Sequence, residues 1–584
     1  MHTPSSLVAG ETASPDFAVE QAAAGGERVT GRPAISVVRR RDFAAVLRRR
    51  AGLLAVCALA AVLGGARLGD EGYVSLHGDM PKFLMNGVFL LDMARDLPFS
   101  GVDAALSYAE HYYARYPALS LGHHPPLLPL AEVPMFAIFG VSVAAARLVG
   151  LIAMIVAVGL LYRLVEDLYG RWPAVAAAVF FATSPQVVIL ARSVLAEILT
   201  LALVMGSVYC LHRFCEAGRR SALVGFVVCA ALSLYAKQLA IFVFPAYLAL
   251  VSARLGPRRL FQRDMVLAAV AIVVVALPLV PVTLLLSPAN VDVVRGGLGD
   301  SRVHYLAIVT LALKQHFAIP VLLLAGVGGI RAAISADRRS WLFLCWAASV
   351  LAGLLLAGVY EPVRYSVYWV PALSALAGSS LAGLKVRPGI RTIAIIVMVI
   401  AAGVQGRSAF RVALPAATGY EDAARFVLAS NPGETVMFSG DIDTGFFTFF
   451  VRKHDAARRL VVLRADKLLT TSRMALTSVE DRIERPEQIY DVLRTFGTRF
   501  VVIEDSPSHS HVLEWLRTET RTPQFQERRR IPIGTTDPRL RGVDLVVYEF
   551  LGATAAAPDA ILSIRMPLVS RSMAIKLTDL TGGQ

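Results

Sequence analysis

The sequence predicts a polytopic α-helical membrane protein with a soluble α/β domain at its C-terminus. Hydrophobic residues make up 55% of the 584 residues and charged residues only 17%, whereas an average soluble domain carries about 25% charged residues. Apolar runs long enough to span a bilayer recur along the chain up to about residue 411 and then stop. This composition excludes an ordinary soluble enzyme and an intrinsically disordered chain.

The N-terminal segment, 1–38, is rich in Ala, Gly, Ser, Thr and Pro and has no hydrophobic periodicity. We therefore predict a disordered cytoplasmic tail. Arginines at 39–41 and 48–50 precede the first apolar run, 51–68. A cleaved signal peptide would begin earlier in the chain, so this run is interpreted as a signal-anchor helix whose N-terminus is cytoplasmic.

The transmembrane domain is predicted over 39–411, with about eleven crossings. Besides the first run, the predicted spans lie near 142–162, 172–190, 197–213, 222–237, 238–254, 264–286, 315–331, 341–358, 366–383 and 390–406. Alternate loops collect basic residues, at 163 and 171, 213–220, 254–263, 331–339 and 385–391. Cytoplasmic loops are enriched in Lys and Arg, so we expect the C-terminal domain on the opposite side of the membrane. The same bias explains much of the net charge of +14, and no nucleic-acid partner is expected.

A long first outer loop is predicted over 69–141. Two amphipathic stretches within it, 80–97 and 102–116, are typical of helices that lie at a membrane interface. The stretch 125–139 is apolar but contains four prolines. Because proline interrupts helical hydrogen bonding, this stretch is interpreted as interfacial or re-entrant.

The C-terminal domain is predicted over 412–551. Helical patterns at 420–430, 486–496 and 509–519 alternate with β-like runs at 435–438, 460–463, 499–503 and 545–548. This alternation favours a small α/β domain with a largely parallel sheet. No nucleotide-binding motif occurs in it, and residues 552–584 are left unassigned. The five cysteines of the chain all fall in or beside apolar segments without zinc-type spacing, which predicts packing roles.

Acidic residues directly after the first span are the first candidates for chemistry. Asp70 and Glu71 follow that span, with Asp79 close behind. A partly desolvated carboxylate at the membrane boundary can act as a general base. The alternative is that these acids only mark the end of a helix.

Other ionisable residues lie at the outer ends of further predicted spans, where each is a functional hypothesis. They are His123 and His124 before a Pro-Pro pair, Arg192 and Glu197 in one short loop, Lys237 between apolar residues, His304, and Arg364 with Tyr365. Each one alone is equally consistent with an interface anchor. Together, cations from several helices can surround one anionic group beside the carboxylates of Asp70 and Glu197. Such a site suits group transfer from a phosphate leaving group, and it also suits a transporter.

The order of these motifs resembles the family 39-like, GT-C-type glycosyltransferases. This group includes bacterial protein-mannosyltransferase-like enzymes and lipid A aminoarabinose transferases. The resemblance covers roughly 65–410 and is carried by the acid pair after the first span, the His-Pro-Pro, "FGVSVAAARL", "TSPQVVILARSVLAE", "AKQ" and a late "RY". It implies a bacterial inner-membrane enzyme that transfers a sugar, with inversion, from a polyprenyl-phosphate donor to an envelope glycolipid, glycan or protein.

The resemblance also implies roles for individual residues. Asp70 matches the base position, with Glu71 beside it, and Glu197 matches a second acidic position. His124, Lys237, Arg364 and Tyr365, with Arg192, are implied donor-phosphate or substrate contacts, and His123 and His304 are candidate metal ligands. The family often has lysine where this chain has His124, and aspartate where it has Glu197. No strict DxD motif is present, so the sequence predicts no particular cofactor and leaves a divalent metal open.

Two other classes of protein are kept as alternatives. A transporter or lipid flippase predicts an internal repeat and paired charges near the centre of the bilayer, and the sequence has no convincing repeat. A non-catalytic membrane scaffold predicts that the outer ionisable residues can be replaced without loss of function. The enzyme is the favoured prediction.

Overall fold

The computed structural model describes the chain from residue 35 to residue 581 with several gaps. The described residues are 35–70, 78–97, 100–120, 124–286, 302–335, 337–357, 362–380, 382, 388–414, 416–430, 432–440, 445–471, 480–508, 510–566 and 571–581. Contacts divide the chain into two units, Met1–Ala51 and Gly52–Gln584. The first unit contains the start of helix α1 (Ile35–Gly65), and most of the predicted tail lies outside the described residues. All contacts reported below belong to the second unit.

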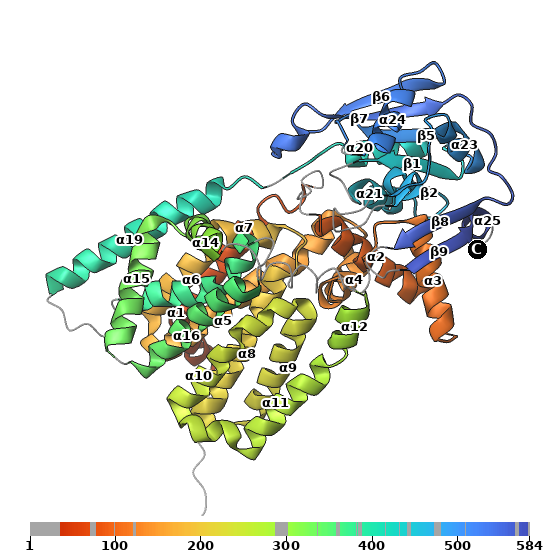
Figure 1. Ribbon diagram of the computed structural model, residues 1–584. Coiled ribbons are helices and arrows are strands. Elements are labelled where there is room, and N and C mark those ends of the chain that lie inside the picture. Colours follow the sequence, from red (N-terminus) through yellow and green to blue (C-terminus); the bar gives the residue numbers. More distant parts are fainter. Residues whose placement is uncertain are drawn as a thin grey trace, which may run out of the picture. The chain divides into compact units, whose positions relative to one another are not determined.

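Helices form the first two thirds of the described chain (Figure 1). After α1 and the first outer loop they are α5 (Val143–Tyr169), α6 (Arg171–Ala182), α7 (Pro185–Arg192), α8 (Glu197–Ala217), α9 (Arg220–Ala236), η1 (Gln238–Val243), α10 (Phe244–Leu255), η2 (Pro257–Phe261), α11 (Arg263–Ala276), α12 (Leu279–Leu286), α14 (Arg302–His316), α15 (Ile319–Ile334), α16 (Arg338–Ala357), α17 (Pro362–Tyr365), η3 (Ser366–Trp369), α18 (Val370–Ser379) and α19 (Pro388–Arg411).

Six of the described helices are long and apolar enough to cross a membrane, and the number rises to eight if two bent pairs each count as one span. The bent pairs are Arg171–Ala182 with Pro185–Arg192, at 60°, and Val309–His316 with Ile319–Ile334, at 110°. Apolar helices such as Arg220–Ala236 are shorter than the roughly 20 residues that a straight span needs. A multi-span helical membrane protein is therefore confirmed, and the total of eleven crossings stays a prediction.

Small residues allow neighbouring helices to pack closely. A Cβ atom added at Gly206 of α8 would lie 3.1 Å from the Sγ of Cys229 in α9, and one added at Gly225 of α9 would lie 2.9 Å from the Sγ of Cys210. Such close approach is typical of helix pairs in membranes. All five cysteines are free and partly buried, so those of this helix pair serve as packing residues.

The first outer loop contains three helices at the predicted places. They are α2 (Met80–Asp96), α3 (Val102–Arg115) and α4 (Leu127–Phe139). Helix α2 packs against α4 so closely that a Cβ atom at Gly87 would collide with the carboxylate of Glu132. Pro134 lies inside α4, and the helix has 13 residues, too few for a straight span.

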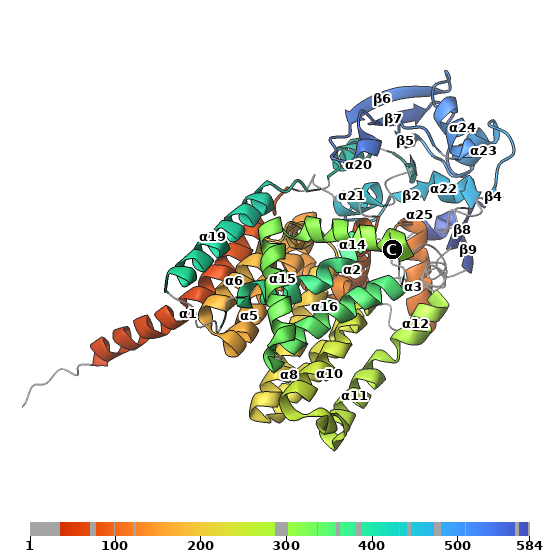
Figure 2. The ribbon, with the colours of Figure 1, turned by 60° about the vertical axis from the view of Figure 1, so that its left-hand side comes forward.

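The C-terminal region contains a five-stranded sheet with the order β2-β1-β5-β7-β6 (Figures 1 and 2). Its strands are β1 (Thr435–Ser439), β2 (Val461–Arg464), β5 (Phe500–Glu504), β6 (Phe525–Pro532) and β7 (Asp544–Phe550). Strands β2, β1 and β5 are parallel, and β7 and β6 join them in antiparallel pairing. The sheet is therefore mixed, with its parallel part at the first three predicted runs.

Helices and a hairpin complete the C-terminal region. The helices are α20 (Tyr420–Ala429), α21 (Phe446–His454), α22 (Ala465–Leu468), α23 (Gln488–Thr495), α24 (His511–Glu519) and α25 (Leu577–Thr581). The unassigned segment after 552 forms a two-stranded hairpin, β8 (Ile561–Met566) with β9 (Arg571–Lys576). Two short strands, β3 (Thr470–Thr471) and β4 (Glu480–Asp481), pair separately.

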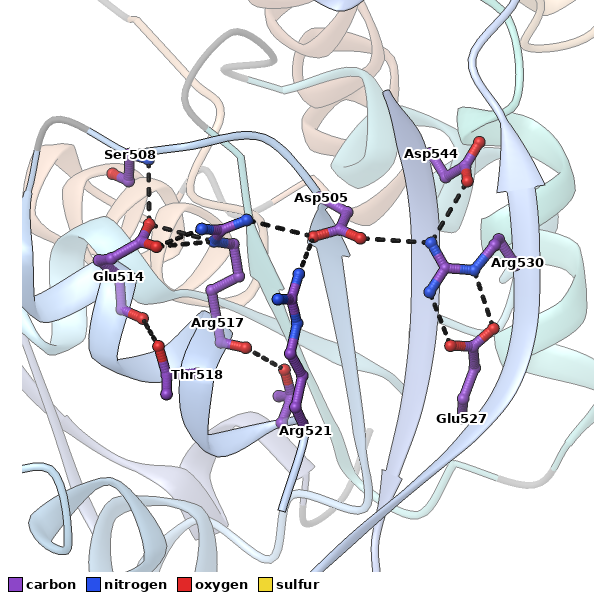
Figure 3. Close-up of polar contacts among 10 residues, drawn as sticks. Asp505, Ser508, Glu514, Arg517, Thr518, Arg521, Glu527, Arg530 and Asp544 are labelled. Carbon is purple, nitrogen blue, oxygen red and sulfur yellow. Dashed lines mark hydrogen bonds and ion pairs between the residues drawn. The ribbon is translucent and has the colours of Figure 1, made fainter. Parts of the chain in front are cut away.

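An ion-pair network on the surface ties α24 to the edge of the sheet (Figure 3). Asp505, which follows β5, accepts from Arg521 at 2.9 Å and from Arg530 of β6 at 3.2 Å, and it lies 3.5 Å from Arg517 of α24. Exposed ion pairs of this kind typically contribute less than about 1 kcal/mol each. The network therefore helps to fix the position of α24 without dominating the stability of the region.

A buried ion pair connects the C-terminal region with the first outer loop. Arg452 of α21 donates from Nε and Nη2 to the two carboxylate oxygens of Asp92 in α2, at 2.9 and 2.6 Å. Both side chains are buried, and Tyr112 of α3 donates its hydroxyl to Asp92 at 2.7 Å. A second, more exposed pair joins Arg458 to Asp96 at 3.0 Å. These contacts fix α2 and α3 against the C-terminal region.

We predict that Arg452→Met destabilises the protein, because it leaves Asp92 buried without its cation. Loss of one partner of a buried pair costs about 3–5 kcal/mol. The thermal unfolding midpoint of the purified full chain should fall markedly. Arg494→Met is the matched control, since Arg494 and its partner Asp491 are 47% and 75% exposed, and it should shift the midpoint little. Equal midpoints for the two variants would contradict the prediction.

Candidate functional site

The centre of the candidate site is the carboxylate of Glu197, the first residue of α8, which is completely buried. Its Oε1 accepts a hydrogen bond from Nζ of Lys237 at 2.9 Å and one from Nε of Arg364 at 2.7 Å. Lys237 follows the end of α9, and Arg364 lies in the short helix α17. Three segments that are distant in the sequence therefore meet through one buried ion triad.

Arg364 extends this triad to a second carboxylate. Its Nη1 lies 2.8 Å from Oδ2 of Asp79, the residue immediately before α2. On the other side of Asp79, Nε2 of His124 lies 3.4 Å from Oδ1, and Nζ of Lys82 lies 4.0 Å from the same oxygen. The Asp79 side chain is 21% exposed, so this carboxylate, unlike that of Glu197, remains accessible from outside the protein.

Aromatic rings line the cationic side of the site. The Lys237 ammonium lies 4.7 Å from the ring centroid of Tyr365, and the Arg364 guanidinium lies 5.4 Å from it. Cations at this distance from an aromatic face are attracted by its quadrupole. The ring of Phe83 in α2 lies 4.6 Å from that of His124. These rings fix the directions of the charged groups.

Opposing effects set the protonation states of Asp79 and His124. Burial alone would raise the pKa of Asp79, but the nearby His124, Arg364 and Lys237 together hold the pKa of that carboxyl well below its usual range. Burial lowers the pKa of His124, and the adjacent Asp79 offsets only part of this effect. At neutral pH, Asp79 is therefore a carboxylate, and burial favours the neutral form of the His124 ring.

Five of the residues singled out from the sequence come together here. They are His124, Glu197, Lys237, Arg364 and Tyr365. Asp79 and Lys82 complete the cluster, although the sequence analysis mentioned Asp79 only as a neighbour of Asp70 and did not name Lys82. One sequence feature could have identified Asp79: it is an acid at the start of a helix that has Pro81 in its first turn. Acids are favoured near the positive end of a helix.

Two residues predicted for the site, Asp70 and Arg192, make other contacts in the structure. Asp70 follows α1, and its backbone oxygen accepts a hydrogen bond from Nη1 of Arg147 at 2.9 Å, while the ion pairs of the cluster are made by Asp79. Arg192 ends α7, is buried, and donates from Nε to the backbone oxygen of Leu63 at 2.7 Å. Leu63 lies in the last turn of α1, so Arg192 satisfies a carbonyl that the helix itself cannot.

The remaining candidates lie beyond what the structure describes. Glu71 and His123 are outside the described residues, and His304 lies in α14 at a position whose side chain is not described. Within the described residues, no group of three or more His, Cys, Asp and Glu side chains is arranged to hold a metal ion. A metal at His123 and His304 therefore stays a prediction.

The charges of the cluster suit an anionic ligand. With His124 neutral, the cations Lys82, Lys237 and Arg364 exceed the carboxylates Asp79 and Glu197 by one positive charge. A phosphate group can compete for these cations through charge-assisted hydrogen bonds. The accessible Asp79 carboxylate beside them can accept a proton. The geometry therefore combines an anion-binding group with a candidate base.

Comparison with known proteins identifies the fold. The family model described as dolichyl-phosphate-mannose-protein mannosyltransferase matches residues 123–283, a segment that contains His124, Glu197 and Lys237. No curated protein matches the chain. Among solved structures, the chain is similar to apo ArnT from Cupriavidus metallidurans, with 14% identity, a TM-score of 0.51 and coverage of 86% of this chain and 98% of that one.

Two further solved structures also match the chain. ArnT from Cupriavidus metallidurans bound to undecaprenyl phosphate matches with 13% identity and a TM-score of 0.51, over 87% of this chain and 99% of that one. The arabinofuranosyltransferase AftD from Mycobacteria matches with 15% identity and a TM-score of 0.45, over 87% of this chain and 42% of that one. The two ArnT structures show that the chain has the fold of the GT-C membrane glycosyltransferases, and the resemblance seen in its sequence is confirmed.

Proposed function

We propose that the protein is a membrane glycosyltransferase that moves a sugar from a polyprenyl-phosphate donor to an acceptor outside the cytoplasm, with inversion. The observation that carries this proposal is the single cluster in which Lys237 and Arg364 lie between Glu197 and Asp79. It is supported by the fold, since a structure of ArnT is known with undecaprenyl phosphate bound. The alternatives of a transporter and a scaffold are not favoured by these comparisons.

The donor phosphate binds to Lys237 and Arg364 in this mechanism. Both cations already face carboxylates and the Tyr365 ring, so their side chains are ordered before the donor arrives. As the bond between the anomeric carbon and the phosphate oxygen breaks, negative charge grows on that oxygen. Preorganised cations stabilise such a charge more in the transition state than in the ground state.

The carboxylate that accepts the acceptor's proton is Asp79. It lies within 2.8 Å of the Arg364 guanidinium and is partly exposed, so an acceptor hydroxyl or amine can reach it beside the donor. The acceptor atom attacks the anomeric carbon while its proton passes to Asp79. The family resemblance instead assigns this role to Asp70 with Glu71, and the variants below separate the two assignments.

Glu197 acts as a positioning residue. It is completely buried and receives hydrogen bonds from both donor-binding cations at a single oxygen. A carboxylate in this position neutralises part of their charge, which lowers the cost of keeping two cations close together in the absence of the donor. His124 and Lys82 hold Asp79 from the other side.

The cellular setting follows from the same proposal. The chain is placed in the bacterial inner membrane with about eleven crossings, a cytoplasmic tail over 1–38, a transmembrane domain over 39–411 and an extracytoplasmic α/β domain over 412–551. Its acceptor is an envelope glycolipid such as lipid A or lipopolysaccharide, another glycan, or a protein. A divalent metal at His123 and His304 is tested by measuring sugar transfer with and without added metal ions.

Asp79→Asn is expected to lower sugar transfer by about 10²–10⁴-fold, the usual contribution of a general base. The measurement is transfer of labelled sugar from a polyprenyl-phosphate donor to acceptors in a membrane extract. Binding of the polyprenyl phosphate should persist, because Lys237 and Arg364 are intact. Asp70→Asn is the matched variant and should keep most of the transfer. Full activity of Asp79→Asn, with loss in Asp70→Asn, would return the role of base to Asp70.

Lys237→Met is expected to weaken binding of undecaprenyl phosphate by about 10–100-fold. The reason is the loss of one charge-assisted hydrogen bond, worth about 1.5–3 kcal/mol. Affinity can be measured by titration of the purified protein. Lys314→Met removes an exposed lysine of α14 and should bind the lipid as the wild type does. Equal affinities in the two variants would exclude Lys237 from the donor site.

The turnover rate is expected to stay nearly constant between about pH 6 and 8. The lowered pKa of Asp79 keeps it ionised throughout this range, and the lowered pKa of His124 keeps that ring neutral over most of it. His124→Gln preserves a neutral hydrogen-bonding group and should leave this profile unchanged in shape. A wild-type rate that falls as the pH rises through 6–7, and does not fall in His124→Gln, would show that protonated His124 is required.

A further inference from the structure

The carboxyl group of Glu132, in the middle of α4, is buried without a polar partner. Its side chain has no solvent exposure, and neither of its carboxyl oxygens has a hydrogen-bond partner among the described residues. Buried polar groups in proteins are nearly always hydrogen-bonded, so an exception of this kind requires a physical cause. A buried ion without a partner costs far more free energy than a buried neutral acid, so these surroundings favour the protonated form of Glu132.

The helices around Glu132 supply no charge that would offset its burial. The helices packed against α4 are α2, α5 and α9. Their titratable side chains are Lys82, Asp92, Arg95 and Asp96 of α2, Arg147, Tyr162, Arg163, Glu166, Asp167 and Tyr169 of α5, and Arg220, Cys229 and Tyr235 of α9. As the structure describes them, none of these side chains pairs with Glu132, and burial alone raises the pKa of its carboxyl well above the usual range. Fully buried glutamates have pKa values of about 8–9, so Glu132 is expected to carry its proton at neutral pH.

Glu132 is connected to the candidate site through the packing of α2 against α4 (Figure 1). Asp79 lies directly before α2, His124 lies shortly before α4, and the two side chains are 3.4 Å apart. Gly87 and Glu132 lie equally far along the two helices, about two turns from Asp79 and His124, and they also meet. A Cβ atom at Gly87 would collide with the carboxyl of Glu132 and would lie 2.9 Å from the ring of Phe136. The two helices therefore run in register from the site to the Glu132 contact.

This contact has room for a neutral acid and not for a hydrated ion. The carboxyl of Glu132 lies against the backbone of α2 at a glycine, where no side chain separates the two helices. An ionised carboxylate needs water or cations around it to replace its lost hydration. Admitting them requires α2 and α4 to separate. Such a movement displaces Asp79 and His124, and a shift of 1 Å in a catalytic group can lower a rate by about 10²-fold.

We propose that Glu132 is a positioning residue for Asp79, and that the protein transfers sugar only while this buried acid keeps its proton. This inference rests on the proposed function, because it concerns the geometry of the same site. When Glu132 loses its proton to hydroxide in the solvent, the contact with Gly87 opens and the start of α2 moves away from the donor-binding cations. Sugar transfer is thereby switched off at alkaline pH.

The first test is the pH dependence of sugar transfer by the full chain in phosphatidylcholine nanodiscs. The wild-type rate is expected to fall between about pH 8 and pH 10, by up to about tenfold per pH unit, as for the ionisation of one group. Glu132→Gln keeps the length of the side chain and cannot ionise, so it should retain most of the transfer at pH 7 and lose most of the alkaline fall. Glu434→Gln is the matched control, since Glu434 is exposed before β1, and it should keep the wild-type profile.

The second test measures the thermal unfolding midpoints of the same proteins between about pH 5 and pH 9. The pKa of Glu132 is raised in the folded state and is about 4.3 in the unfolded state. The unfolded state therefore releases the proton first, and the wild type loses stability as the pH rises from the lower value towards the higher one. Glu132→Gln lacks this loss, so its midpoint should exceed that of the wild type by a margin that grows with pH. Glu434→Gln should follow the wild type.

Three results would overturn the inference. They are a wild-type rate that does not fall up to pH 10, an alkaline fall of equal size in the wild type and Glu132→Gln, and a difference in midpoint between these two proteins that does not change with pH. If Glu132→Gln does not fold, Glu132→Met takes its place, because a carboxyl without hydrogen-bond partners can be replaced by an apolar chain of similar length.

The proposed function fails separately from this inference. If the wild type transfers no sugar at any pH, the glycosyltransferase proposal is wrong. The unfolding midpoints need no substrate, so they still report whether Glu132 is protonated in the folded protein.

Discussion

The buried ion triad of Glu197, Lys237 and Arg364 is the constraint on which the rest of the site depends. A carboxylate with no solvent exposure is tolerated only if cations and hydrogen bonds replace its lost hydration. Both cations reach the same oxygen, so the start of α8, the end of α9 and the short helix α17 have to meet at one point. Arg364 then fixes Asp79 and, through it, the start of α2. The residues that we propose as the anion-binding site are therefore also the residues that allow these segments to pack together.

Helix α2 connects the two halves of the described structure. Its first residue follows Asp79, and Asp92 near its other end is held by Arg452 of the C-terminal region. A helix of 17 residues is about 25 Å long and stiff, so both ends are positioned together. The C-terminal region thereby restrains the residue that we propose as the base. An apolar contact would not fix the axial position of α2 as sharply as a two-point carboxylate–guanidinium pair.

Several positively charged or protonatable side chains lie around the Asp79 carboxylate. His124, Arg364, Lys237 and Lys82 lie around it. Together, His124, Arg364 and Lys237 hold the pKa of the Asp79 carboxyl well below its usual range. The surface ion pairs of Asp505 instead join α24 to the sheet, in a network of four carboxylates and three arginines (Figure 3).

The class of the protein and much of its local structure can be predicted from the amino-acid sequence. Its composition and apolar runs predicted a helical membrane protein, its patterning located α2, α3 and α4, and apolar runs of β-type located β1, β2, β5 and β7. It missed β6, because an edge strand with the sequence FQERRRIP exposes most of its charged residues and shows no apolar alternation.

The sequence also proposed His124, Glu197, Lys237, Arg364 and Tyr365 as site residues, from their predicted common side of the membrane. The packing of the helices and strands alone shows that Asp79 joins these residues as a second acid and that Arg452, Arg464 and Lys467 contact the first outer loop. These ion pairs join residues that are 167 to 360 positions apart. They form only because of the way the helices and strands pack, which cannot be predicted from the local periodicity of the sequence.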